Sequence, residues 1–316
     1  MSPAVAIKTW KRFRAMSEAA IPKSPPPSST KQAAGNSVHS SANRIGARFA
    51  QLAKAGEMGL IAYITTGDPS LDATGKIVVA AAEAGADVIE LGVPFSDPVA
   101  DGPTIQRASE RALRAGATLA GVIDVVKRVR AKSDVPLILF SYYNPILQMG
   151  VGKFAGAAAA AGADGALATD LTPEEAGDYR EAMRAHGLDT IFLAAPTSTD
   201  ARLAKIAEVS TGFLYVISRT GVTGERSSLP EDLPELARRV RRFTKLPLAV
   251  GFGISQPSHV SVLGGIADAA VVGSALVAEI EKATSGDDAA ARVAARIRIL
   301  KGAARQGVSR RGVEQK

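Results

Sequence analysis

From residue 44 onward the sequence alternates short apolar runs with longer amphipathic stretches, and this alternation constrains the fold more than any other feature. The runs are rich in Val, Ile, Leu and Ala and recur at a spacing of roughly 25 residues. Eight strands are predicted, at 60–65, 87–92, 136–142, 165–169, 190–193, 213–217, 248–251 and 269–272. Segments with helical spacing follow them, for example 72–84, 174–186, 201–209 and 231–243. Strands that alternate with helices are parallel, because each helix carries the chain back to the starting edge of the sheet.

Eight such units predict a (β/α)8 barrel, the TIM barrel, as a single domain. A doubly wound open sheet is the alternative that the pattern alone leaves open. The phrase Ala-Gly-Ala-Asp occurs before two predicted strands, at 84–87 and 161–164, where a left-handed helix cap is expected. Thr172, followed by proline, predicts that the helix at 174–186 begins directly after it.

The chain is predicted to divide into one barrel and two tails. Residues 1–44 are rich in Ser, Pro, Lys and Arg, which predicts a disordered basic leader. The barrel is predicted over 45–305, a length that α/β barrels reach as one domain, and 306–316 form a C-terminal tail. We expect a cytoplasmic protein, with targeting to an organelle as the alternative if the leader is a transit peptide.

The net charge of +7 comes almost entirely from the leader. Residues 1–44 hold seven Lys or Arg and one Glu, so the rest of the chain carries a net charge of only +1. A nearly neutral body with 5% aromatic residues argues against a nucleic-acid-binding surface. No apolar run reaches about 18 residues, so no contact with a membrane is expected. The absence of cysteine excludes thiolate catalysis and cysteine-ligated metal.

Glu90 interrupts an apolar strand near its carboxyl end, which is the end of a barrel strand where chemistry is carried. Burial of a carboxylate in a parallel strand costs free energy unless the group is paired or neutralised. One interpretation is therefore a structural acid that pairs with a backbone or arginine group. The other is a proton donor, whose pKa is raised by an apolar barrel mouth.

Asp101 ends the loop that follows Glu90, and the same loop contains Asp97 and three prolines. The prolines limit the conformations of the loop, so two carboxylates on it suggest paired acid and base roles. Turn and helix-cap chemistry is the alternative for both aspartates.

Glycines follow the last two predicted strands. Gly251, Gly253 and Ser255 come after the seventh strand, and Gly273 and Ser274 come after the eighth. Glycine lets backbone amides approach an anion, and Ser274 can begin a helix whose N-terminus favours negative charge. These loops are where barrels commonly bind phosphate, so a phosphate site is predicted, with tight turns as the alternative.

Other polar residues are less informative. The segment 218–224 after the sixth strand is interpreted as a mobile lid or an ordinary flexible loop, with Arg219 available to an anion. None of the three histidines, His39, His186 and His259, falls at a predicted strand end, which argues against histidine catalysis or a histidine-ligated metal. No lysine ends a predicted strand, which argues against Schiff-base chemistry.

The segment 91–98, Leu-Gly-Val-Pro-Phe-Ser-Asp-Pro, continues to Ala-Asp-Gly-Pro-Thr-Ile-Gln at 100–106 and resembles the signature of tryptophan synthase alpha chains. The resemblance runs from about Arg44 to about Ala303, and includes 66–69, 143–145, 218–224 and 251–255. It implies a barrel lyase that cleaves indole-3-glycerol phosphate to indole and glyceraldehyde 3-phosphate and uses no cofactor.

The resemblance also implies roles for individual residues. Glu90 would be the general acid and base, and Asp101 would hold the indole N–H. The indole pocket would be lined by Tyr63, Tyr215 and Phe252. The phosphate would be bound by backbone amides of Gly224, Gly253, Gly273 and Ser274, and by the Ser274 hydroxyl.

The implied partner is a beta chain that carries pyridoxal phosphate and receives indole within an α2β2 complex. The alternatives are another phosphate-binding barrel enzyme, or a non-catalytic barrel that only activates a beta chain. The presence of both Glu90 and Asp101 argues against these alternatives. The leader departs from the family pattern, as does Tyr63, where a phenylalanine is also familiar.

Overall fold

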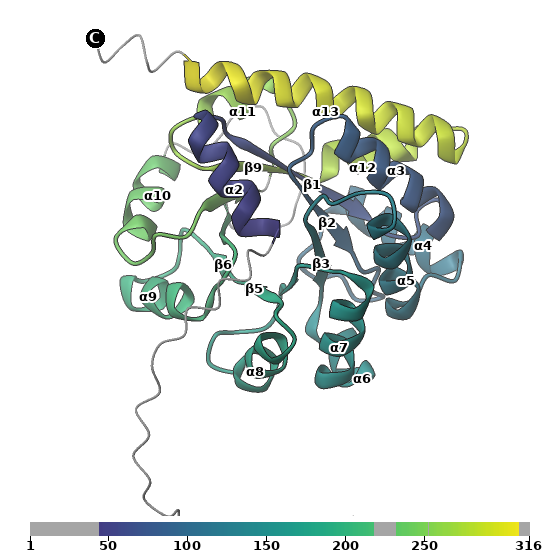
Figure 1. Cartoon of the computed structure of the whole chain (residues 1–316), viewed down its shortest axis with the longest axis horizontal. Coiled ribbons are helices and arrows are strands. Elements are labelled where there is room, and N and C mark those ends of the chain that lie inside the picture. The colour runs from purple at the N-terminus through teal and green to yellow at the C-terminus, as the bar shows by residue number, and fades with distance from the viewer. Residues whose placement is uncertain (1–43, 218–231, 252, 310–316) are drawn as a thin grey trace, which may run out of the picture. The chain divides into compact units, whose positions relative to one another are not determined.

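The computed structural model describes residues 44–217, 232–251 and 253–309, and these residues form a parallel β-barrel surrounded by helices (Figure 1). The strands are β1 Gly59–Thr65, β2 Val88–Gly92, β3 Leu137–Ser141, β4 Gly165–Ala168, β5 Asp189–Ile191, β6 Leu193–Ala194, β7 Leu214–Ile217, β8 Leu248–Gly251 and β9 Ala269–Val272. Their order is β5-β4-β3-β2-β1-β9-β8-β7-β6, and neighbouring strands pair in parallel. The barrel prediction is confirmed.

One predicted strand, 190–193, is divided in two by Phe192. Its first part, β5, pairs with β4, and its second part, β6, pairs with β7. The Phe192 carbonyl accepts a hydrogen bond of 3.1 Å from the Tyr215 amide. Because β5 and β6 are the two ends of the sheet order, this one interrupted strand brings the sheet back on itself. The open doubly wound alternative is therefore wrong.

Helices cover the outside of the barrel (Figure 1). They are α3 Leu71–Glu83, α4 Pro103–Arg114, α5 Leu119–Arg130, α6 Tyr143–Met149, α7 Val151–Ala161, α8 Gly177–Ala185, α9 Asp200–Val209, α10 Leu233–Arg241, α11 Pro257–Leu263, α12 Ser274–Glu281 and α13 Gly286–Ser309. The predicted start of α8 after Thr172 is wrong. Residues 173–175 form a separate turn, in which the Glu175 amide donates to the Thr172 carbonyl at 3.1 Å, and the helix begins only at Gly177.

Side chains of each strand alternate between two cores, because successive residues point to opposite faces. In β2, Ile89 and Leu91 belong to the large outer core between the barrel and its helices. Val88 belongs to the inner core of the barrel. Helix α2, Arg44–Ala55, adds three buried side chains to this inner core, those of Ile45, Phe49 and Leu52. The amino end of the barrel is thus filled by apolar groups.

Three aspartates clamp the amino ends of neighbouring strands. Each donates its backbone N–H to the carbonyl of a residue at the start of the adjacent strand, and its carboxylate accepts the N–H of that same residue. The pairs are Asp87 with Leu60, Asp164 with Leu137, and Asp268 with Leu248. Two of these aspartates end the repeated Ala-Gly-Ala-Asp phrase, whose glycines have the predicted positive φ angles of 108° and 92°. The repeat therefore supplies both the helix cap and the strand clamp.

The predicted tails fall almost entirely outside the described residues. Of the leader at 1–44 only Arg44 is described, and it begins α2. The predicted boundaries of leader, barrel and C-terminal tail stay predictions. None of the described helices is long and apolar enough to cross a membrane.

Candidate active site

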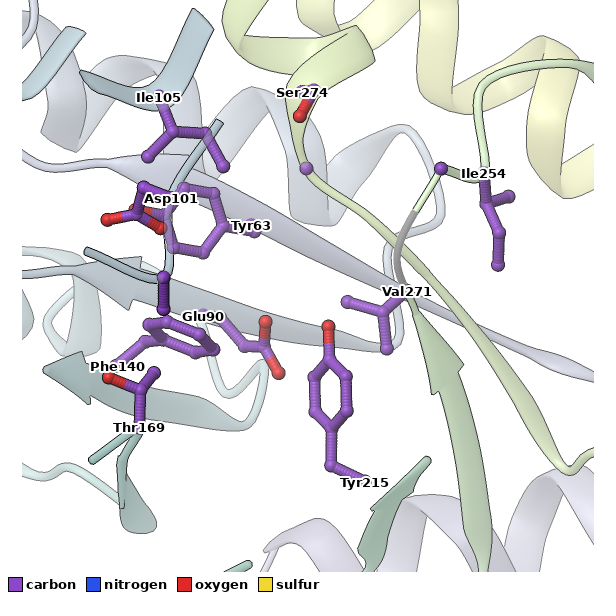
Figure 2. Close-up of a pocket in the computed structure, with 13 residues that line it drawn as sticks. Tyr63, Glu90, Asp101, Ile105, Phe140, Thr169, Tyr215, Ile254, Val271 and Ser274 are labelled. Carbon is purple, nitrogen blue, oxygen red and sulfur yellow. The ribbon is translucent and has the colours of Figure 1, made fainter. Parts of the chain in front are cut away.

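A pocket lies at the carboxyl end of the barrel (Figure 2). The lining residues come from several strands and from the loops that follow them: Tyr63, Glu90, Ala100, Asp101, Ile105, Phe140, Thr169, Tyr215, Gly253, Ile254, Val271, Gly273 and Ser274. The structure thus brings together most of the residues that the sequence singled out.

Glu90 lies in the middle of the pocket wall, on β2 between Tyr63 of β1 and Ile138 of β3. Its side chain is completely buried, and neither carboxyl oxygen has a hydrogen-bond partner among the described residues. Burial raises the pKa of Glu90 from its usual 4.5 to about 8. The described part of the chain offers no partner for a structural acid, which favours the proton-donor interpretation.

Asp101 lies on the loop between β2 and α4, and it is 8% exposed. Its Oδ2 atom accepts a hydrogen bond of 3.1 Å from the Tyr142 hydroxyl. Burial raises the pKa of Asp101 to about 6, while the bond from Tyr142 acts in the opposite direction. Asp97, on the same loop, is exposed and accepts a bond from Ser96 next to it. Asp97 thus fits the turn alternative, and Asp101 is the aspartate of this loop that lines the pocket.

The two carboxyl groups of the pocket therefore differ in protonation at neutral pH. Glu90 is mainly protonated at pH 7, because its pKa is about 8. Asp101 is mainly ionised, because its pKa is about 6. Such a separation of two pKa values is how one site supplies both a proton donor and a negative charge.

Aromatic rings form the walls beside these carboxyl groups. Tyr63 and Phe140 pack edge to face, with ring centroids 5.2 Å apart. Tyr215 enters from β7, and Figure 2 shows its hydroxyl pointing toward the Glu90 carboxyl. A methyl group at Gly92 would overlap the hydroxyl of Tyr63, so the glycine on the adjacent strand makes room for this ring. The result is a flat, apolar space suited to an aromatic ring.

The opposite rim of the pocket is built from backbone. Gly253 follows β8 with a φ of 86°, and Gly273 precedes α12, which begins at Ser274. All three residues line the pocket, as the glycine pattern predicted, whereas Gly251 and Ser255 do not. First-turn amides of a helix lack intrahelical partners and favour an anion. The described residues therefore place backbone amides and the start of α12 in the same pocket as the two carboxyl groups.

Two predicted contacts, Gly224 and Phe252, lie outside the described residues, as does the predicted lid with Arg219. Conversely, five apolar lining residues and one threonine were not identified from the sequence as site residues: Ala100, Ile105, Phe140, Ile254, Val271 and Thr169. The alternation of strand side chains was the available signal for Phe140, which is two residues after inward-facing Ile138. In the described ranges no group of three or more His, Asp or Glu side chains is placed to hold a metal ion.

Comparison with known proteins identifies the family of this chain. The family model of the tryptophan synthase alpha chain matches residues 49–305. A tryptophan synthase alpha chain from Solibacter usitatus (strain Ellin6076) is 56% identical over 239 residues, which are 76% of this chain and 90% of the relative. The corresponding protein of Geotalea uraniireducens (strain Rf4) is 48% identical over 259 residues, covering 82% and 97%.

Solved structures give the same result. A structure of Mycobacterium tuberculosis tryptophan synthase has a TM-score of 0.78 at 38% identity, covering 84% of this chain and 99% of that one. A tryptophan synthase subunit alpha from Legionella pneumophila str. Paris has a TM-score of 0.75 at 38% identity, covering 83% and 98%. With the family model, the relatives and the barrel in agreement, the chain belongs to the tryptophan synthase alpha chain family, which carries out the alpha half-reaction of tryptophan biosynthesis.

Proposed function

We propose that this chain cleaves indole-3-glycerol phosphate to indole and glyceraldehyde 3-phosphate, with Glu90 and Asp101 as the catalytic residues. The observation that carries the proposal is the presence of two buried carboxyl groups, Glu90 and Asp101, in one pocket, where burial raises the pKa of both. An aromatic wall on one side and a helix N-terminus on the other match a substrate with an indole ring and a phosphate.

The proposed reaction begins with transfer of the Glu90 proton to indole C3. The ring nitrogen then carries positive charge, which the Asp101 carboxylate stabilises by accepting the indole N–H. Glu90, now ionised, takes the proton of the glycerol hydroxyl next to the ring. That oxygen becomes the aldehyde oxygen, the bond from this carbon to C3 breaks, and its electron pair restores the aromatic ring. The proton balance at Glu90 is zero, so the enzyme is ready for another cycle.

The binding groups are proposed to act at the two ends of the substrate. Tyr63, Phe140 and Tyr215 would enclose the indole ring. The amides of Gly253, Gly273 and Ser274 would bind the phosphate, together with the Ser274 hydroxyl. Anchoring of both ends fixes indole C3 next to Glu90, and such positioning lowers the entropic part of the barrier.

We also propose a tryptophan synthase beta chain as the protein partner, in an α2β2 complex that passes indole to the beta subunit. Membership of the alpha chain family and the likeness to a Mycobacterium tuberculosis tryptophan synthase structure support this partner. Co-elution of the purified chain with a beta chain at the mass of a heterotetramer would test it, and separate elution at micromolar concentrations would contradict it.

The test of the reaction is release of indole from indole-3-glycerol phosphate by the purified chain, with and without a beta chain. We expect slow release that accelerates when the partner is added. Glu90→Gln, which keeps the shape but cannot exchange a proton, should lower the rate by about 10²- to 10⁴-fold or more. Glu110→Gln is the matched control, because Glu110 lies on the exposed side of α4 and pairs with Arg114.

The outcomes separate the parts of the proposal. A near-normal rate for Glu90→Gln would remove Glu90 from the mechanism. No indole from folded wild-type protein in either condition would remove the proposed substrate and point to another phosphate-binding barrel reaction.

A further inference from the structure

Tyr142, directly after β3, contacts the loop that carries Asp101 at three points. Its hydroxyl accepts a hydrogen bond of 2.9 Å from the Ala100 amide and donates one of 3.1 Å to Asp101 Oδ2. Its ring packs on Phe95, with centroids 5.1 Å apart and an angle of 33° between the planes. Tyr142 is only 4% exposed, although it does not line the pocket. One side chain therefore holds both the start and the end of the loop.

The backbone of Tyr142 is itself held in place. Its carbonyl accepts a bond of 2.7 Å from the Ser141 hydroxyl, and it caps the start of α6. The amide of the next residue, Tyr143, donates to Asp170 at 2.7 Å. Tyr142 thus joins the fixed end of β3 to the loop that carries Asp101.

The direction of the two hydrogen bonds matters for Asp101. A tyrosine hydroxyl has one proton, and here its oxygen accepts from Ala100, so the proton is available to the carboxylate. The bond to Asp101 is 3.1 Å long, which is at the long end for a hydrogen bond between two oxygen atoms. It engages Oδ2, and a carboxylate has a second oxygen that can accept a bond from a ligand.

We infer that Tyr142 is a positioning residue for the reaction, which holds the Asp101 carboxylate ionised and oriented to accept the indole N–H. The inferred role in the reaction rests on the function proposed above for Asp101. The effect of Tyr142 on the Asp101 carboxylate does not, and it can be measured without substrate.

The groups around Asp101 allow the effect of the Tyr142 hydroxyl on the Asp101 pKa to be measured. The titratable groups that face it are Tyr142 from the end of β3, Tyr63 from β1 and Glu90 from β2. Among the described residues no Lys or Arg contributes to the pKa of Asp101, and the bond from Tyr142 is the influence that lowers it. Loss of the Tyr142 hydroxyl should therefore raise the pKa of Asp101 above its value of about 6.

The experiment compares Tyr142→Phe with Tyr143→Phe in the full-length chain. Each variant lacks one tyrosine hydroxyl, and the two positions are adjacent in the chain. Tyr143→Phe is the control, because the Tyr143 ring packs on Tyr179 rather than on the loop that carries Asp101. The pKa of Asp101 is followed by NMR of carbon-13-labelled aspartate carboxyl groups, with Asp101→Asn to assign the signal. We expect the pKa to rise by about one pH unit or more in Tyr142→Phe and to stay unchanged in Tyr143→Phe.

Kinetics of indole release provide the second readout. At pH 7 we expect kcat/KM of Tyr142→Phe to fall by about 10- to 100-fold, with part of the loss recovered at higher pH as Asp101 ionises. A purely structural defect would lower the rate without moving the pKa of Asp101. An unchanged Asp101 pKa in folded Tyr142→Phe would overturn the inference, whatever the rate.

Two further results complete the test. If Tyr142→Phe does not fold, 3-fluorotyrosine at position 142 keeps the packing and makes the hydroxyl a stronger donor, so the pKa of Asp101 should fall. No change there would also overturn the inference. Absence of indole from the wild type, together with the expected pKa changes, would contradict the proposed function and leave the Tyr142 effect on Asp101 established.

Discussion

The buried carboxyl groups at the amino end of the barrel differ from the two that line the pocket at its carboxyl end. At the amino end, Asp87 accepts bonds from Lys301 at 2.7 Å, from Arg48 and from the Leu60 amide. In the same way, Asp164 accepts hydrogen bonds from the side chains of Arg130 and Arg44 and from the Leu137 amide. At the carboxyl end, the Glu90 carboxyl has no hydrogen-bond partner among the described residues, and Asp101 has a neutral tyrosine.

The difference distinguishes carboxyl groups that stabilise the fold from carboxyl groups that can take part in proton transfer. A carboxylate with cations and amides around it stays ionised and holds structural elements together, but it has no reason to exchange a proton. A carboxyl group buried without a cation costs stability and gains a pKa near neutrality, where proton transfer is efficient. In this barrel Asp87 and Asp164, at the amino end, are of the first kind, and the pocket residues Glu90 and Asp101 are of the second. Asp68, after β1 at the carboxyl end, is also of the first kind, because Arg111 donates to both of its carboxylate oxygens.

The largest effect on stability is expected from Asp87→Asn. The change removes the carboxylate that lies 2.7 Å from Lys301, whose side chain is 5% exposed, and leaves this buried charge with the Met58 carbonyl at 3.3 Å and Glu57 at 3.8 Å. Breaking such a pair costs about 3 to 5 kcal/mol of unfolding free energy, measurable by urea denaturation at pH 7. The control is Asp134→Asn, since Asp134 is 94% exposed at the same end. Loss of indole release in folded Asp87→Asn would show that the two ends are not independent.

Glu90→Gln should have the reverse effect and stabilise the protein at high pH. The pKa of Glu90 is raised on folding, so the wild type loses stability as the pH rises from about 4.5 through about 8. Glutamine removes this loss. The gain should be near zero at pH 4 and on the order of 4 kcal/mol at pH 8. Equal stabilities of both proteins at pH 8 would show that Glu90 is paired in solution.

Asp101→Asn should lower kcat/KM for indole release by about 10²-fold, which corresponds to about 2.7 kcal/mol of transition-state stabilisation. The amide is neutral and cannot balance positive charge on the indole nitrogen. Asp97→Asn, on the exposed part of the same loop, should stay within about twofold of the wild type. Full activity of Asp101→Asn would disprove the contact with the indole N–H.

The smallest effects are expected from pH itself. Below about pH 6, kcat/KM should fall as Asp101 becomes protonated, and above about pH 8 it should fall as Glu90 loses its proton. Each limb should approach about tenfold per pH unit. A profile from pH 5 to 9.5 measures both limbs. A flat profile would mean that neither carboxyl group changes its protonation in this range.

Much of this architecture was predictable from local patterns. The apolar runs identified the strands, and the alternation with helices required parallel pairing. Glu90 was recognisable because a carboxylate in an apolar run demands an explanation. The start of α8 was predicted wrongly, because Thr172 and Pro173 belong to a turn of their own before the helix. The division of one strand at Phe192 could not be predicted from the sequence either, since it arises only when the barrel closes.

By itself, then, the sequence determined where the strands lie along the chain, the residues at their carboxyl ends and the family of the chain, because these depend on periodicity and on residue type. Only the tertiary structure decided which acids are paired and which are not. Lys301 reaches Asp87 from 214 residues away, and Tyr142 reaches Asp101 from 41 residues away. The protonation of a carboxyl group depends on such neighbours and on its burial, and both exist only once the barrel has folded.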